Sequence, residues 1–237
     1  MRLLPQPRSD TPKPAPEPDT ARRSSLRTLG NWIAALCLVL ALAGLVRTHA
    51  PRRNHAKQKG EAIANARQVA LALFAFDAKY GSFPDSNTAA DVKAGTSTPL
   101  TLGDRSSNQL LRQLLAAGVA DEQIFWARTS IWSRRPDNVF NSDTTALAPG
   151  ECSFAYVLGA SSPGNLERPV LTSPMIPGTN RFDPETFDDK AIVVRADLSV
   201  RAETIRPDGR VFINGMDLFD PRQPFWGGKA PDIKWPE

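Results

Sequence analysis

The feature that most constrains this chain is an uncharged apolar run near its N-terminus. Residues 31–46 read NWIAALCLVLALAGLV and contain no Asp, Glu, Lys or Arg. As an α-helix, Leu29–Val46 would be roughly 27 Å long at about 1.5 Å per residue, which is at the short end of a membrane span. The run therefore predicts a transmembrane helix over 29–47.

A cleaved secretory signal is the alternative interpretation of this run. Ala41, Ala43 and Gly44 are small enough to form a cleavage site. The long segment 1–28 in front of the run favours a retained anchor, because a signal peptide usually has a short basic leader. This segment holds six prolines among polar residues, and predicts a disordered tail or a ligand for a proline-binding module.

Basic side chains lie on both sides of the apolar run. Arg22, Arg23 and Arg27 precede it, and a basic juxtamembrane linker over 48–60 follows it. Lys and Arg next to an apolar run are typical of a membrane surface, and their excess on the distal side would favour a cytoplasmic location for that side. We expect the lipid bilayer as a partner and no nucleic acid, because the remaining sequence carries acidic and basic residues in comparable number.

Residues 61–237 predict one globular domain that begins with an amphipathic helix over 61–80. Gly81 and Pro84 end this helix. Between Val69 and Phe76 every residue is apolar, so we expect this half of the helix to be buried on most sides. The predicted core face recurs at spacings of three and four residues: Ala62, Ala66, Val69, Leu73, Phe76 and Tyr80.

The pattern changes from helical to sheet-like further along the chain. A second helix is predicted over 107–118, whereas 82–102, the proline-rich segment 161–184 and the aromatic-containing segment 215–237 are expected to be loops. Strands are predicted over 153–158, 191–196 and 200–205, and over 211–213 after the turn Pro207-Asp208-Gly209. The predicted fold class is α+β.

Two segments resemble the type IV pilin-like family, and within it most closely the major pseudopilin of type II secretion systems. They are Asn65–Pro84, which ends in Tyr80-Gly81-Ser82-Phe83-Pro84, and the C-terminal Pro231–Trp235. Together they cover about a quarter of the chain. The resemblance implies a pilin-like long N-terminal helix, transmembrane and then amphipathic, packed on a small antiparallel β-sheet with a loop-rich C-terminal segment.

The resemblance also implies a structural role at a membrane. A protein of this family would be a single-pass subunit of a bacterial type II secretion or related filament system, in contact with other pilin-like subunits or secretion-system components. Its C-terminal domain would lie outside the bacterial inner membrane. In the family a Gly precedes the apolar helix and a Glu stands at the fifth position of that helix. Here Gly30 can stand for the Gly, but the fifth residue after it is Ala35. The missing Glu favours the alternative, an anchored binding module that does not assemble.

The major pseudopilin has a calcium site in its C-terminal loop, and the resemblance implies one here. Asp217, Asp220 and Asp232 are the candidate ligands, with Asn214 nearby. Carboxylates and carbonyl oxygens on irregular chain are the ligands that Ca²⁺ prefers. The alternative is that these Asp residues cap turns, as Asp residues before Pro often do. We expect no other cofactor.

The residues needed for common catalytic schemes are missing from the predicted domain. His49 and His55 are the chain's two histidines, so no Ser-His or Cys-His pair can form beyond residue 55. Cys37 lies in the apolar run and Cys152 in the domain, which favours neither a disulfide nor a metal site. We therefore expect a protein that is not an enzyme.

Overall fold

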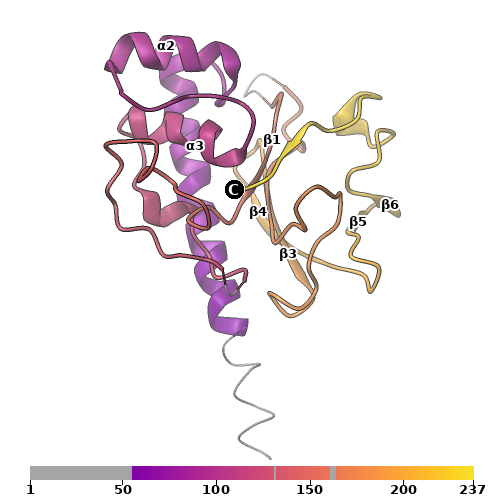
Figure 1. The fold of residues 1–237 in the computed structure, drawn as a ribbon. Coiled ribbons are helices and arrows are strands. Elements are labelled where there is room, and N and C mark those ends of the chain that lie inside the picture. The colour runs from indigo at the N-terminus through magenta and orange to yellow at the C-terminus, as the bar shows by residue number, and fades with distance from the viewer. Residues whose placement is uncertain (1–54, 131, 161–163) are drawn as a thin grey trace, which may run out of the picture. The chain divides into compact units, whose positions relative to one another are not determined.

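A computed structural model describes residues 55–130, 132–160 and 164–237, and Figure 1 shows their course. The predicted tail, the predicted transmembrane segment 29–47 and the linker up to residue 54 lie outside the described residues. The described part opens with a helix over 55–80, which already includes the last residues of the predicted linker. Its end agrees with the sequence: Gly81 has a φ of 78°, and its N–H donates to the Asp77 carbonyl at 2.7 Å.

Two further helices, α2 (Ser86–Thr96) and α3 (Ser107–Ala116), and a 3₁₀ turn, η1 (Glu122–Phe125), follow the first helix. The position of α3 agrees with the predicted helix, but α2 lies inside the predicted loop 82–102. It has a weak apolar pattern and begins with a strong cap, because the Asp85 carboxylate accepts the backbone N–H groups of Asn87 and Thr88. The Thr88 hydroxyl also bonds the Gln113 amide oxygen of α3 at 2.7 Å.

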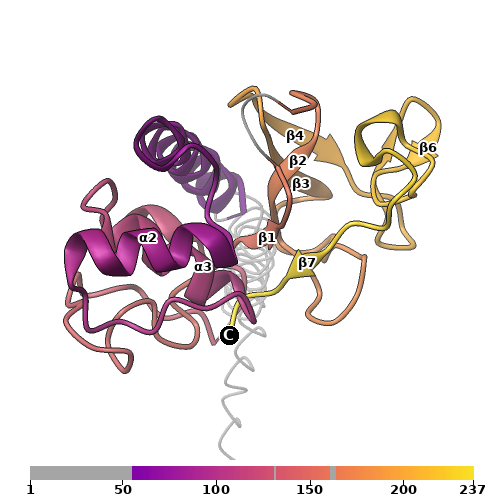
Figure 2. The same cartoon turned by 90° about the horizontal axis from the view of Figure 1, so that it is seen from above.

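A five-stranded antiparallel sheet in the order β4-β3-β2-β1-β7 forms the centre of the domain, as the view from above in Figure 2 shows. Strand β2 lies in the middle of this sheet although the sequence predicted a loop there, and its five residues are all buried. The C-terminal segment, also predicted as a loop, contributes β7 beside β1. The strands are β1 (Ala155–Val157), β2 (Pro169–Ser173), β3 (Lys190–Arg195), β4 (Val200–Thr204) and β7 (Ile233–Lys234).

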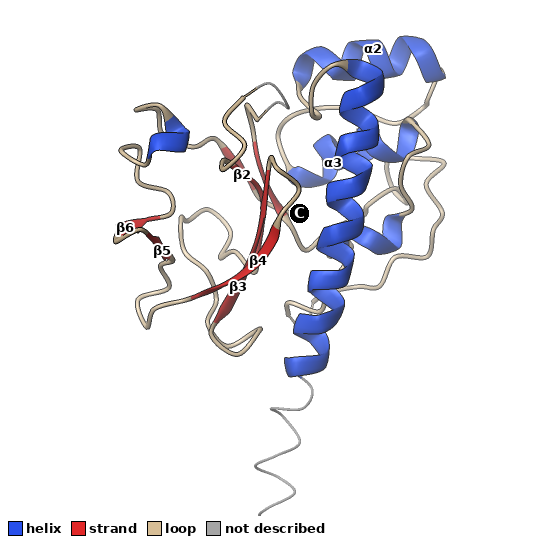
Figure 3. Ribbon diagram, turned by 180° about the vertical axis from the view of Figure 1, so that it is seen from behind, coloured by secondary structure: helices blue, strands red, loops and turns tan. Residues whose placement is uncertain are grey.

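Each face of the sheet packs against a separate core. In β3, Ile192 and Val194 belong to the cluster that contains the 55–80 helix and α3. Their neighbours Ala191 and Val193 belong to a second cluster with the C-terminal aromatic residues. Figure 3 shows the helices on one side of the sheet and strands β5 (Phe212–Ile213) and β6 (Met216–Asp217) on the other. The second side carries this small hairpin and the 3₁₀ turn η2 (Pro224–Trp226).

The predicted pilin-like fold, with a helix that is transmembrane and then amphipathic, is wrong. Of the helices in the described ranges, none combines the length and the apolar character that crossing a membrane needs. The 55–80 helix carries charges along its length, including Lys57, Arg67 and Lys79, and its best apolar stripe packs against protein. The architecture also differs, because α2, α3 and long loops cover one face of the sheet and the C-terminal segment adds a strand.

Candidate functional site

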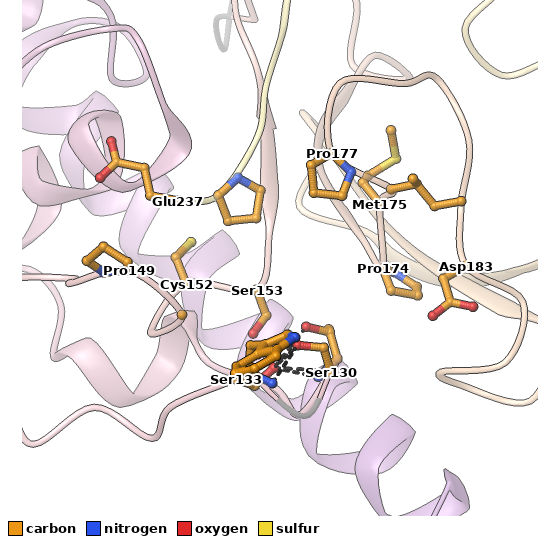
Figure 4. A pocket seen from close by; sticks show the side chains of 15 residues that line it. Ser130, Ser133, Pro149, Cys152, Ser153, Pro174, Met175, Pro177, Asp183 and Glu237 are labelled. Carbon is orange, nitrogen blue, oxygen red and sulfur yellow. Dashed lines mark hydrogen bonds between the residues drawn. The ribbon is translucent and has the colours of Figure 1, made fainter.

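An apolar cleft of about 490 Å³ lies between the loops that follow η1 and the end of β2. Figure 4 shows Pro174, Met175 and Pro177 facing Pro149 and Cys152 across it. Trp132 also lines the cleft, and it is 82% exposed. A large exposed indole beside proline and methionine side chains is a surface that can hold an extended apolar segment.

The polar groups of the cleft are occupied within the chain. The Ser133 hydroxyl oxygen accepts the backbone N–H groups of Thr129 at 3.1 Å and Ser130 at 3.0 Å. The Asp183 carboxylate accepts the Thr186 hydroxyl at 2.6 Å and the backbone N–H of Glu185 at 2.9 Å. These groups stabilise turns, so the cleft offers mainly apolar contact to a ligand.

Cys152 lines this cleft on the same side as Pro149 and is only 4% exposed. Burial raises the pKa of its thiol to about 11, so the thiol stays protonated at neutral pH. Its sulfur lies 3.6 Å from the Ser107 hydroxyl and 3.5 Å from the Phe154 carbonyl oxygen. Cys152 therefore behaves as a small buried side chain, and the cleft holds no activated nucleophile at this position.

A second candidate surface is the outer face of the 55–80 helix. Leu71 is 64% exposed and Phe74 is 55% exposed, against the expectation that this half of the helix is buried on most sides. Ala64, Ala75 and Ala78 are exposed on the same face, with the polar Arg67 and Gln68 among them. The spacing Ala64, Leu71 and Ala78 repeats every seven residues, which is typical of a seam between helices.

A hollow of about 430 Å³ adjoins this outer helix face. Leu71, Ala72 and Ala75 line one side of it, and Val119 and Ile124 line the other. Gln68 and Asp121 also line the hollow, so it offers polar as well as apolar contacts beside the helix. A side chain from a neighbouring protein could enter it while the partner lies along the helix.

The three Asp residues predicted to bind calcium each lie beside a basic side chain. Asp217 Oδ2 is 3.7 Å from Arg210 Nε, and Asp232 Oδ1 is 3.1 Å from Lys234 Nζ. Asp220 Oδ2 is 2.7 Å from Arg222 Nη2, and hydrogen bonds from Arg222 lower the pKa of this carboxyl to about 2.

Two of these Asp residues also cap turns, which was the alternative interpretation. Asp217 accepts the backbone N–H of Phe219 at 2.8 Å, and Asp220 accepts that of Arg222 at 2.9 Å. Across the described ranges, no three His, Cys, Asp or Glu side chains are grouped so that they could hold a metal ion. The structure therefore does not bring the three carboxylates together as a calcium ligand set, and calcium binding stays a prediction.

Sequence reasoning missed both candidate surfaces for different reasons. The cleft is built from loop residues near 130, 150 and 175, which share no periodic signal. The outer helix face did have a signal, because an uninterrupted apolar stretch on a helix places side chains on every side of it. Leu71 and Phe74 lie outside the 4-3-4 stripe, but Ala70 and Ala72 do too and are buried, so the sequence did not mark the outer residues clearly.

No protein-family model, no curated protein and no solved structure matches this chain. The two candidate surfaces are therefore interpreted from their own geometry and from the sequence.

Proposed function

We propose that the protein is a membrane-anchored structural subunit that assembles through the outer face of its 55–80 helix. The apolar run 31–46 attaches the chain to the bacterial inner membrane, and the domain lies outside the cytoplasm. The neighbours are pilin-like subunits or components of a type II secretion or related filament system.

The exposed pair Leu71 and Phe74 is the observation that carries this proposal. A surface helix usually has one apolar stripe, which faces the core, and a polar opposite face. Here the core stripe is fully used, and a second apolar stripe faces outward. Fully burying an exposed Leu or Phe side chain is worth about 1.5–3 kcal/mol. Leu71 and Phe74 still expose more than half of their surface, which a side-by-side helix contact would bury.

The sequence around the helix supports a membrane setting for this contact. An uncharged run precedes the described helix, and Arg47, Arg52 and Arg53 lie between the two in the sequence. Anchored chains share a surface, which raises their effective concentration and lets modest contacts assemble them. The resemblance of Asn65–Pro84 to pilin-like proteins supports a subunit role, although the fold differs from the one it implied.

Cysteine cross-linking in membranes tests the proposal. Cys37 and Cys152 are first replaced, and a single cysteine is then introduced at Leu71 or Phe74. We expect oxidation to give disulfide-linked dimers, which are the largest covalent product that a chain with a single cysteine can form. A cysteine at the exposed Asp91 of α2 is the matched control, and equal cross-linking there would contradict the proposal.

The cleft around Trp132 favours a second function, that of an anchored binding module which does not assemble. Its apolar floor and exposed indole suit capture of an extended segment from another protein. The same experiment separates the two functions. The binding module would be supported if the cysteine variants at 71, 74 and 91 all stay monomeric and a Trp132→Ala variant no longer captures a partner.

A further inference from the structure

We propose that β4 is a second assembly surface, which pairs with β4 of another copy of this chain as an antiparallel two-fold ladder centred on Ala202. This inference does not depend on the helix contact, because it concerns the edge of the sheet. It extends the five-stranded sheet of one copy into that of the next.

The backbone of β4 has free hydrogen-bonding groups on its outer side. The Arg195 N–H donates to the Ser199 carbonyl at 3.0 Å, and the Ile205 N–H donates to the Asp189 carbonyl at 2.9 Å. These two bonds show which residues of β4 face β3, because alternate residues of an antiparallel strand direct their backbone N–H and C=O groups to the same neighbouring strand. Val200, Ala202 and Thr204 therefore direct their N–H and C=O groups away from β3.

The outer side of β4 is open within the described residues. Strand order places β4 at the end of the sheet, and no hydrogen bond from those residues uses the outward groups of Val200, Ala202 or Thr204. All five residues of β4 pair with β3 in a continuous register without a bulge. Ala202 is exposed and presents only a methyl group, so another backbone can approach closely.

The opposite edge of the same sheet, formed by β7, is poorly suited to pairing with a strand of another chain. Strand β7 has only two residues, Ile233 and Lys234, and Pro231 and Pro236 lie close on either side. Short edge strands and prolines are devices that prevent edge pairing. β4 has neither, which singles it out as the edge available to a partner.

The side chains of β4 are self-complementary in the proposed register. A two-fold axis at Ala202 places Arg201 of one copy opposite Glu203 of the other, twice. Both residues lie at non-hydrogen-bonded positions of the new ladder, where opposing side chains are closest. Within one copy Glu203 is only loosely engaged, at 3.8 Å from Arg195, so it can also meet Arg201 of a neighbour. From this charge pattern we infer that the partner of the edge is β4 of a second copy of this chain.

A single cysteine at Ala202 tests the register in the full-length chain, held in mild detergent with Cys37 and Cys152 replaced. Hydrogen-bonded antiparallel partners have Cα atoms about 5.5 Å apart, within the range of a disulfide. We expect Ala202→Cys to give a disulfide-linked dimer on oxidation. Thr204→Cys is the register control, because the two copies of residue 204 would be four positions apart, or about 13 Å.

Charge reversal tests why the partner is another β4. In the Ala202→Cys background, Arg201→Glu and Glu203→Arg each place like charges opposite each other, and we expect several-fold less dimer from either variant alone. A mixture of the two variants restores opposite charges, and we expect the mixed dimer to form at the original level. The melting temperature of each variant checks that the fold is intact.

Two results would overturn the inference. One is dimer formation at Thr204→Cys as fast as at Ala202→Cys, and the other is a yield that does not respond to charge reversal or mixing. Failure here leaves the helix contact untouched, because cysteines at Leu71 and Phe74 report on a different surface. A chain that uses both surfaces would form extended ladders when both cysteines are present.

Discussion

Both faces of the 55–80 helix carry large apolar side chains, but their surroundings are opposite. The inner face presents Val69, Leu73 and Phe76, each at most 1% exposed, to the core that the helix shares with α3 and the sheet. The outer face presents Leu71 and Phe74, both more than half exposed. The difference teaches that hydrophobicity alone does not separate a core residue from an interface residue on this helix. The angular position of a residue around the helix axis separates them, because Leu71 and Phe74 lie on the side opposite Val69, Leu73 and Phe76.

The sharpest test of this comparison exchanges the two phenylalanines for alanine one at a time. Phe76 is fully buried, and Phe76→Ala should lower the free energy of unfolding by about 3–5 kcal/mol. Phe74→Ala should change it by less than about 0.5 kcal/mol, because a half-exposed side chain leaves no cavity. Denaturant unfolding of both variants measures the difference, and equal losses would show that the two faces are alike.

Leucines give the same comparison with a smaller expected difference. Leu73→Ala removes a buried side chain and should cost about 2–5 kcal/mol, whereas Leu71→Ala should be close to neutral. The two residues lie two positions apart on the same helix, so helix propensity cannot explain a difference between them. A large loss of unfolding free energy from Leu71→Ala in dilute, monomeric protein would show that Leu71 belongs to the core.

Asn65 lies on the flank between the two faces and should show an intermediate effect. Its side-chain amide donates to the carbonyl oxygens of Trp126 at 2.8 Å and Gln123 at 3.2 Å. Asn65→Ala should destabilise the domain by about 1 kcal/mol through loss of these bonds. Asn65→Asp is the matched variant, because it keeps the shape but removes the donors, and thermal unfolding should show a loss for both.

The pH dependence of stability should report on the inner core through Glu122. Glu122 is fully buried, and this burial raises the pKa of its carboxyl above the ordinary value. The folded state therefore holds the proton more tightly than the unfolded chain. This contribution to stability is present below the ordinary pKa and is lost as the pH rises through the folded-state value.

Glu122→Gln tests this effect because it removes the titration while keeping an acceptor for the Leu147 N–H, which Glu122 accepts at 2.6 Å. The difference in melting temperature between the variant and the unchanged chain should grow in favour of the variant from pH 4 to pH 7. Asp220 is a control with the opposite shift, because Arg222 lowers the pKa of this exposed carboxyl to about 2. Any contribution of Asp220 to stability is therefore lost as the pH falls and not as it rises. A pH-independent difference would contradict the assignment to Glu122.

The sequence predicted those parts of the fold that carry a clear period. The inner helix face, α3, and strands β3 and β4 all follow from regular spacing of apolar residues. Several elements could not be found this way, among them α2, β2 and β7. α2 depends on its Asp85 cap and on the contact between Thr88 and Gln113, and β2 begins with a proline and lies buried on both faces without alternation.

The candidate surfaces were harder to predict than the fold, for a physical reason. The cleft brings together loops that are far apart in sequence, from Thr129 to Pro236. The edge of β4 depends on strand order, which sequence pattern does not specify. The three Asp residues were found by type alone, and nothing in the sequence indicated that basic side chains would lie beside each of them.

The size of the full-length protein in detergent shows whether the outer helix face holds copies of this chain together. Leu71→Lys combined with Phe74→Lys places charge on the outer stripe and touches no core residue. We expect sedimentation to show smaller assemblies for this double variant than for the unchanged chain, at an unchanged melting temperature. Assemblies of the same size in both proteins, with the fold intact, would contradict assembly through the outer helix face.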